Sequence, residues 1–266
     1  MPDQDVAAKQ AVLNALLKSG FPFQTAIAEI APQVPRCKLI AEEFPWRDDA
    51  GTEHFLDLVL YEDNFILTIE CKKTEKEIFT FLQPAELLER DYIRARCLFV
   101  NQIQDSTKRL ELFCGDWDIK PKSRESQFCV VSTSDSGRDQ RMLEKDARLL
   151  VQGAEAFGRC VKQKRQPTGE EPDRVILPVI VTNAKLFQAT YKASDVSLET
   201  GQLPVTPAPE ISPLRWIRFR KAFTSGGRDT GERTVFVIAA SALQEFLHDL
   251  DRISSGPSLR GKVLIP

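Results

Sequence analysis

FLDLVLYEDNFILTIECK, residues 55–72, contains two apolar runs that carry Asp57, Glu70 and Lys72 in otherwise hydrophobic surroundings. Each run has the length and the Phe, Ile, Leu and Val content of a largely buried strand. The polar residues Glu62-Asp63-Asn64 between the runs are typical of a turn. The sequence therefore predicts a β-hairpin over this stretch.

The hairpin brings its charged side chains together. Side chains alternate between the two faces of a strand, so Glu70 and Lys72 point to the same face. If the strands pair about Asp63, Asp57 on the first strand comes opposite the residues around Glu70. Burying two acids and a lysine is unfavourable unless they pair with one another or bind a cation. The pattern therefore predicts either an ion pair or a metal site.

This arrangement resembles the PD-(D/E)XK nuclease superfamily, whose members have the restriction-endonuclease-like fold. The resemblance lies in Asp57 on one strand and Glu70-Cys71-Lys72 on the next, although Leu56 stands where the superfamily usually has proline. It covers about residues 22–192. It implies that Asp57 and Glu70 bind a divalent cation, usually Mg²⁺ with Mn²⁺ as an alternative. It also implies that Lys72 positions the attacking water and steadies the scissile phosphate.

The order of predicted elements favours an α/β chain. We expect helices at 6–18 and 22–31, a strand at 36–46, the hairpin, a long helix at 139–162 and a buried strand at 175–182. The resemblance implies a restriction-endonuclease-like mixed β-sheet flanked by helices. Residues 1–21 would form an N-terminal helix and 22–192 the nuclease-like core, with an insertion at about 74–125. Residues 193–266 would form a C-terminal α+β extension packed on the core.

Shorter segments inside and after the insertion also give predictions. A helix is expected around 85–95, a loop at 115–121 and an amphipathic helix at 241–253.

Further acids are candidates for the same site. Glu29 lies in the second helix, where the superfamily often supplies an additional carboxylate to the metal. A solvated helix residue is an equally good interpretation of Glu29. Glu42 and Glu43 are adjacent in a strand and face opposite sides, so at most one of them can point toward the site.

Basic residues outside the hairpin are candidates for nucleic-acid contact. Arg218 and Arg220 share one face of a predicted strand with Trp216, and such a face can follow a phosphate backbone. The alternative is an edge strand whose basic side chains lie over apolar surface. Lys73 is a further candidate, with a solvated strand end as its alternative.

Composition excludes several classes. A chain of 266 residues that is 42% hydrophobic can bury one sizeable core. A net charge of −2 argues against a general basic coat, so any contact with nucleic acid must come from local patches. No run approaches the ~18 apolar residues of a membrane helix, and the first residues are too polar for a signal peptide. We therefore expect a cytoplasmic protein that does not contact a membrane.

The cysteines and histidines do not suggest another chemistry. The six cysteines are scattered without CxxC pairs, which favours free thiols over a zinc site or disulfides. Neither of the two histidines lies near a nucleophile, so hydrolysis by a catalytic triad has little support.

The sequence thus predicts a metal-dependent DNA endonuclease that hydrolyses phosphodiester bonds in restriction, defence or repair. It would act as a homodimer or with a partner subunit of a defence system. In one alternative, the same fold serves as a nucleic-acid-binding or assembly subunit that is inactive alone. In another, the triplet arises by chance and Lys72 only pairs with Glu70 or Asp57. Metal binding discriminates among these three hypotheses.

Overall fold

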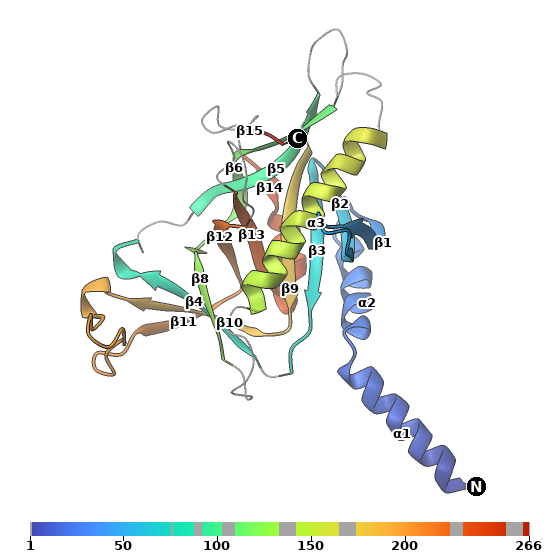
Figure 1. The fold of residues 1–266 in the computed structure, drawn as a ribbon, viewed down its shortest axis with the longest axis horizontal. Helices are drawn as coiled ribbons and strands as arrows, with labels where there is room; N and C mark the ends of the chain where they lie inside the picture. Colours follow the sequence, from blue (N-terminus) through green and yellow to red (C-terminus); the bar gives the residue numbers. More distant parts are fainter. Residues whose placement is uncertain are drawn as a thin grey trace.

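A large mixed β-sheet with helices on both faces forms the centre of the molecule (Figure 1). The computed structural model describes residues 2–75, 77–87, 92–102, 110–132, 142–164, 174–223, 231–253 and 263–265. The α/β class and the mixed sheet flanked by helices, both predicted from the sequence, are confirmed. No helix within these ranges is long and apolar enough to cross a membrane.

The helices and strands have the following bounds. The α-helices are α1 (Pro2–Lys18), α2 (Phe21–Ile30), α3 (Met142–Lys164) and α4 (Leu243–Asp249). The 3-10 turns are η1 (Ala31–Gln33), η2 (Ala85–Leu87), η3 (Ala193–Asp195) and η4 (Ala240–Ala242). The main sheet contains β1 (Cys37–Arg47), β2 (Glu53–Glu62), β3 (Phe65–Lys72), β5 (Tyr92–Gln102), β6 (Leu110–Ser123), β7 (Glu125–Ser126), β9 (Arg174–Thr182), β12 (Trp216–Ala222), β13 (Glu232–Ala239), β14 (Asp251–Arg252) and β15 (Val263–Leu264). The smaller sheet contains β4 (Ile78–Pro84), β8 (Phe128–Ser132), β10 (Lys185–Tyr191) and β11 (Glu210–Leu214).

The central strand of the main sheet is β9. Its sequence RVILPVIVT is nearly all apolar, as is typical of a strand buried on both faces. Along one edge β9 pairs in parallel with β3, from Phe65 opposite Val175 to Lys72 opposite Thr182. Along the other edge, β5 pairs with the beginning of β9 and β13 pairs in parallel with its end. The predicted hairpin, β2 and β3, therefore lies beside the best-buried strand of the chain.

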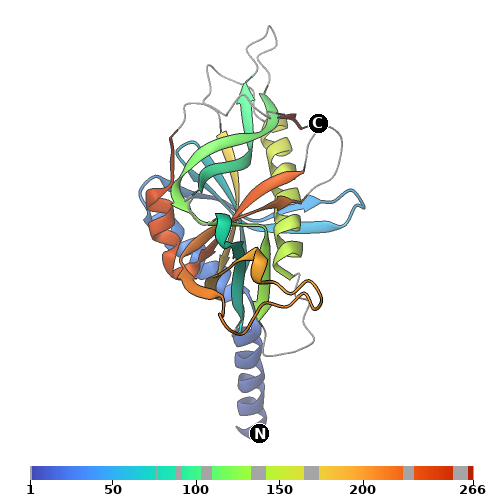
Figure 2. The same ribbon diagram turned by 90° about the vertical axis from the view of Figure 1, so that its left-hand side faces the viewer.

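Two hydrophobic layers hold the helices against this sheet. On one face α3 packs with an apolar stripe, and Figure 1 shows it crossing the main sheet. The stripe comprises Leu143, Ala147, Leu150, Val151 and Ala154, all buried. On the opposite face, α2 contributes Ile27 and Ala28 and α4 contributes Phe246. Helix α1 instead extends away from the rest of the chain in both views (Figures 1 and 2).

Three predictions about local structure were wrong. Of the helix expected around 85–95, residues 85–87 form the short turn η2, residues 88–91 lie outside the described residues, and β5 has begun by Tyr92, because Ala95 to Val100 of this strand are buried on both faces. The loop expected at 115–121 lies inside β6, where Trp117 and Ile119 are fully buried and outweigh the turn propensity of the flanking Gly115 and Pro121. The helix expected at 241–253 is the shorter α4. The predicted start of the long helix at 139 lies outside the described residues.

The segments expected as an insertion and an extension both enter the main sheet. Strand β5, from 74–125, pairs with β9 and with β6. Strand β13, from the segment 193–266, pairs with the end of β9 along the same edge that β5 occupies at its beginning. Residues that are distant in the sequence therefore share one core with the hairpin.

Candidate active site

The hairpin register places Asp57 and Glu70 directly across from each other. Leu58 pairs with Ile69 in the antiparallel β2–β3 ladder, and Asp57 and Glu70 are the next positions along the two strands. Side chains at directly opposed positions share a face and approach closely. The observed register thus agrees with the prediction that the two carboxylates lie opposite each other. The turn of the hairpin is centred between Asp63 and Asn64, whereas the prediction centred it on Asp63.

A third carboxylate continues this row onto β1. The β1–β2 ladder pairs Phe44 with Leu56, so the neighbouring Glu43 lies opposite Asp57. Glu43 has φ +50°, in the left-handed region that side chains other than glycine seldom adopt. Such strain persists only where surrounding contacts hold it, and it often accompanies functional sites. Glu43, and not Glu42, lies beside the cluster, since its carboxylate bonds Gln24 and contributes to the raised pKa of Asp57.

Helix α2 contributes Gln24 to this cluster. The Nε2 group of Gln24 donates to Glu43 Oε1 at 2.5 Å and to the backbone carbonyl of Asp57 at 3.3 Å. Glu29, the residue that the superfamily resemblance suggested, is exposed, about 140° around the helix axis from Gln24. The structure does not bring Glu29 to the cluster, because the buried side of α2 runs through Gln24, Ile27 and Ala28.

Lys72 points to the same face as Glu70 but meets an acid from α3. Its Nζ lies 2.6 Å from Oδ2 of Asp146, and both side chains are largely shielded from solvent. Asp57 is held separately, because its Oδ2 accepts a hydrogen bond from the backbone N–H of Cys71 at 2.6 Å. These two interactions hold the side chains of Lys72 and Asp57 at defined positions.

A cavity of about 180 Å³ opens between α3 and the hairpin at this point. Asp57, Glu70 and Asp146 line it together with Trp46 and His54. His54 stacks on Trp46 with ring centroids 4.7 Å apart, and its Nε2 lies 3.0 Å from Asp48 Oδ2. His54 therefore lies at the rim of the cavity, where its ring is already engaged by Trp46 and Asp48.

The electrostatics of the cluster favour a bound cation. Burial, followed by the Asp57 and Asp146 carboxylates, raises the pKa of Glu70 to about 8. Burial also raises the pKa of Asp57 to about 6, although the N–H of Cys71 opposes this shift; the Glu43 carboxylate contributes in the same direction as burial. Four carboxylates share the region with one lysine, so negative charge accumulates there as the pH rises.

The donor set suits a hard cation held by two carboxylates. Within the described residues, no group of three or more His, Cys, Asp or Glu side chains converges as a metal site. Mg²⁺, however, usually takes only one or two protein carboxylates and completes its octahedron with waters and substrate phosphate oxygens. Asp57 and Glu70 supply such a pair beside a cavity.

The structure corrects the predicted nucleic-acid contacts on β12. Arg218 is completely buried, and its guanidinium donates to the carbonyl oxygens of Ile119 (2.6 Å) and Pro121 (3.0 Å) and to Ser123 Oγ (2.5 Å). Arg220 lies 3.1 Å from Glu232. These arginines hold β6 and β13 together, because the face that was expected to be exposed is covered by β6.

Lys73 also has a structural role. Its Nζ contacts the backbone carbonyl of Leu17 and lies 2.9 Å from that of Ser19, at the end of α1. Carbonyl groups at a helix C-terminus lack partners within the helix and attract such cations. Lys73 thereby connects the hairpin to the protruding helix.

Sequence reasoning missed Asp146 and Gln24. A signal for Asp146 was present, because an acid three residues after Leu143 and four before Leu150 falls within the apolar stripe of α3. Gln24 offered no comparable signal, since an amide on a short helix is ordinary surface chemistry.

Comparison of the chain with models of known protein families, with curated proteins and with solved structures gave no match. The candidate site therefore rests on the geometry of this chain alone.

Proposed function

We propose that the chain is a metal-dependent nuclease that hydrolyses phosphodiester bonds in DNA, and that its fold is of the restriction-endonuclease-like type. The supporting arrangement is the antiparallel meander β1-β2-β3, with β9 parallel to β3 and α3 lying across the sheet. The observation that carries the proposal is the opposition of Asp57 and Glu70 on the hairpin, with Lys72 two residues further along the same face.

The residues divide the chemistry among them. Asp57 and Glu70 would hold Mg²⁺, and Cys71 N–H keeps the Asp57 carboxylate oriented. A bound Mg²⁺ supplies a Lewis acid for the phosphate and lowers the pKa of a coordinated water. Lys72, on the same face as Glu70, would offset with its ammonium the charge that develops on the phosphate oxygens and so stabilise the transition state. Asp146 is a positioning residue that holds Lys72 in place in the absence of substrate.

The proposal is tested by incubating the purified chain with supercoiled plasmid and with single-stranded DNA. The incubations contain Mg²⁺, Mn²⁺ or a chelator. Cleavage that requires metal supports it. Absence of cleavage on both substrates with either metal, by a chain shown to be folded by circular dichroism, contradicts it.

Replacement of Asp146 by Asn should shift the pH at which the metal binds. The Asp146 carboxylate raises the pKa of Glu70, so its removal lowers that pKa and allows Mg²⁺ to bind at lower pH. We also expect cleavage to fall roughly tenfold, because Lys72 loses the partner that orients it. Mg²⁺ titrations at several pH values measure the first effect.

An unchanged pH dependence of Mg²⁺ binding in Asp146→Asn would show that Asp146 does not influence Glu70. Glu144→Gln, on the same helix, is the matched control, because Glu144 pairs with Lys221 rather than with the cluster.

A further inference from the structure

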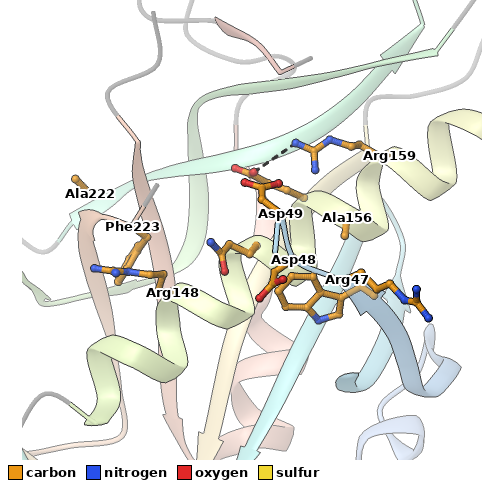
Figure 3. A pocket seen from close by; sticks show the side chains of 11 residues that line it. Arg47, Asp48, Asp49, Arg148, Ala156, Arg159, Ala222 and Phe223 are labelled. Atoms are coloured by element: carbon orange, nitrogen blue, oxygen red, sulfur yellow. Dashed lines mark ion pairs between the residues drawn. The ribbon is translucent and has the colours of Figure 1, made fainter. Parts of the chain in front are cut away.

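A second, larger cavity lies beside the candidate site. It encloses about 570 Å³ between α3, the turn that joins β1 to β2, and the end of β12 (Figure 3). Trp46 lines both this cavity and the one that contains Asp57 and Glu70. The same two elements, α3 and the β1–β2 hairpin, form walls of both. The two cavities are therefore neighbours that share Trp46.

The wall supplied by α3 is rich in polar side chains. Arg148, Gln152, Glu155 and Arg159 line the cavity at spacings of three and four residues, which places them on one side of the helix. The twelve residues from Arg148 to Arg159 span eleven helical steps, which cover about 16 Å. This length matches the rise of about five nucleotides along one strand, at 3.4 Å each.

The acids of the cavity are mostly engaged by other groups. The Asp48 carboxylate pairs with His54 and accepts hydrogen bonds from the backbone N–H groups of Ala50 and Thr52. Glu155 lies 2.9 Å from the buried Arg233 and 3.8 Å from Arg159. These contacts reduce the negative charge that the cavity presents to a ligand.

Arg148 is available to a ligand. It is exposed and has no hydrogen bond or ion pair to any residue in the described ranges. Arg47 is a weaker candidate, because it is 71% exposed, lies 3.7 Å from Glu53 and extends away from Arg148 in Figure 3. Asp49, an exposed acid on the wall, disfavours an anion in its vicinity. An anion is therefore expected nearer to Arg148.

We propose that this cavity binds the phosphodiester backbone of the DNA strand that passes the candidate active site, with Arg148 contacting a phosphate. The inference rests on the proposed function, because it assigns the path of the same substrate. Arginine suits this role because its planar guanidinium donates two parallel hydrogen bonds to a phosphate. Arg148 and Asp146 belong to the same helix, and Asp146 lines the cavity of the candidate site while Arg148 lines this one.

The test measures binding separately from cleavage. Affinity of the full chain for a short DNA duplex and for a single strand is determined in chelator, at several salt concentrations between about 50 and 200 mM. We expect Arg148→Ala to weaken binding roughly fivefold and to reduce the slope of log affinity against log salt by about 1. Arg148→Glu should weaken binding further, because it introduces repulsion.

Lys192→Ala is the matched control, since Lys192 is exposed but lies outside this cavity, and we expect it to retain the wild-type slope. Equal affinity and slope for the wild type and both Arg148 variants would overturn the inference, as would the absence of any DNA binding by the wild type. A chain that binds DNA through Arg148 but cleaves none would support this inference and contradict the proposed function. The two failures are thus distinguishable.

Discussion

Asp57→Ala and Glu70→Gln are each expected to lower metal-dependent DNA cleavage on the order of 10³-fold, and Lys72→Ala on the order of 10²-fold. The two acids are opposed on the hairpin and would share one cation, so the loss of either leaves a single protein carboxylate. The loss of Lys72 removes a charge that stabilises the transition state but leaves both metal ligands in place. Initial rates of nicking of supercoiled plasmid, at saturating Mg²⁺, measure these effects.

Glu29→Gln provides the matched control for this series. Glu29 belongs to the helix that contributes Gln24 but is exposed on another side, so the rate should remain within about twofold of wild type. A wild-type rate in Asp57→Ala would remove the hairpin carboxylates from the mechanism. A large loss in Glu29→Gln would instead restore that acid as a metal ligand.

Glu70→Gln should stabilise the metal-free protein at alkaline pH. The folded-state pKa of Glu70 is about 8, whereas an ordinary glutamic acid titrates near 4.5, so the folded state binds the proton more tightly. Stability contributed by this group is present below about pH 4.5 and is lost as the pH rises to about 8. Removal of the titrating group should therefore raise the free energy of unfolding above pH 8 by on the order of 2–4 kcal/mol.

Chemical denaturation in chelator at pH values from about 5 to 9 measures this effect. This range covers most of the interval between the pKa of Glu70 in the unfolded chain and its pKa in the folded protein. Mg²⁺ should reduce this difference in the free energy of unfolding between Glu70→Gln and the wild type. It should stabilise the wild type most strongly at alkaline pH and leave Glu70→Gln unaffected. Glu42→Gln, an exposed position on β1, should follow the wild-type profile. A Glu70→Gln variant with the same pH profile as the wild type would show that Glu70 is not a buried, proton-binding group.

The hairpin and the central strand could be predicted because their signals are local. Alternation in residues 65–72 places Glu70 and Lys72 on one face, and the apolar run in 174–182 identifies a buried strand without any tertiary information. The partner of Lys72 could not be derived in this way. Asp146 reaches it only because α3 docks across the sheet, and the rotation of a helix about its axis depends on packing with residues that are distant in the sequence.

The same limit explains the failed assignment of Arg218. Two arginines and a tryptophan on one face of a strand favour an exposed, basic surface when the strand is considered alone. In the folded chain, β6 covers that face and its backbone carbonyl oxygens accept the hydrogen bonds of Arg218. A composition pattern shows that a face is polar but not which element lies against it.

The pairing of β13 with the end of β9 has a consequence for synthesis of the protein. Until residues 232–239 leave the ribosome, residues Val179–Thr182 of β9 lack their β13 neighbour on one edge, although β3 is already available to pair with the other edge. Nascent chains that stop before this point should therefore expose an apolar strand edge, which is prone to aggregation and recognised by chaperones. The acids on the hairpin, although encoded in the first third of the chain, would acquire their final geometry only near the end of translation.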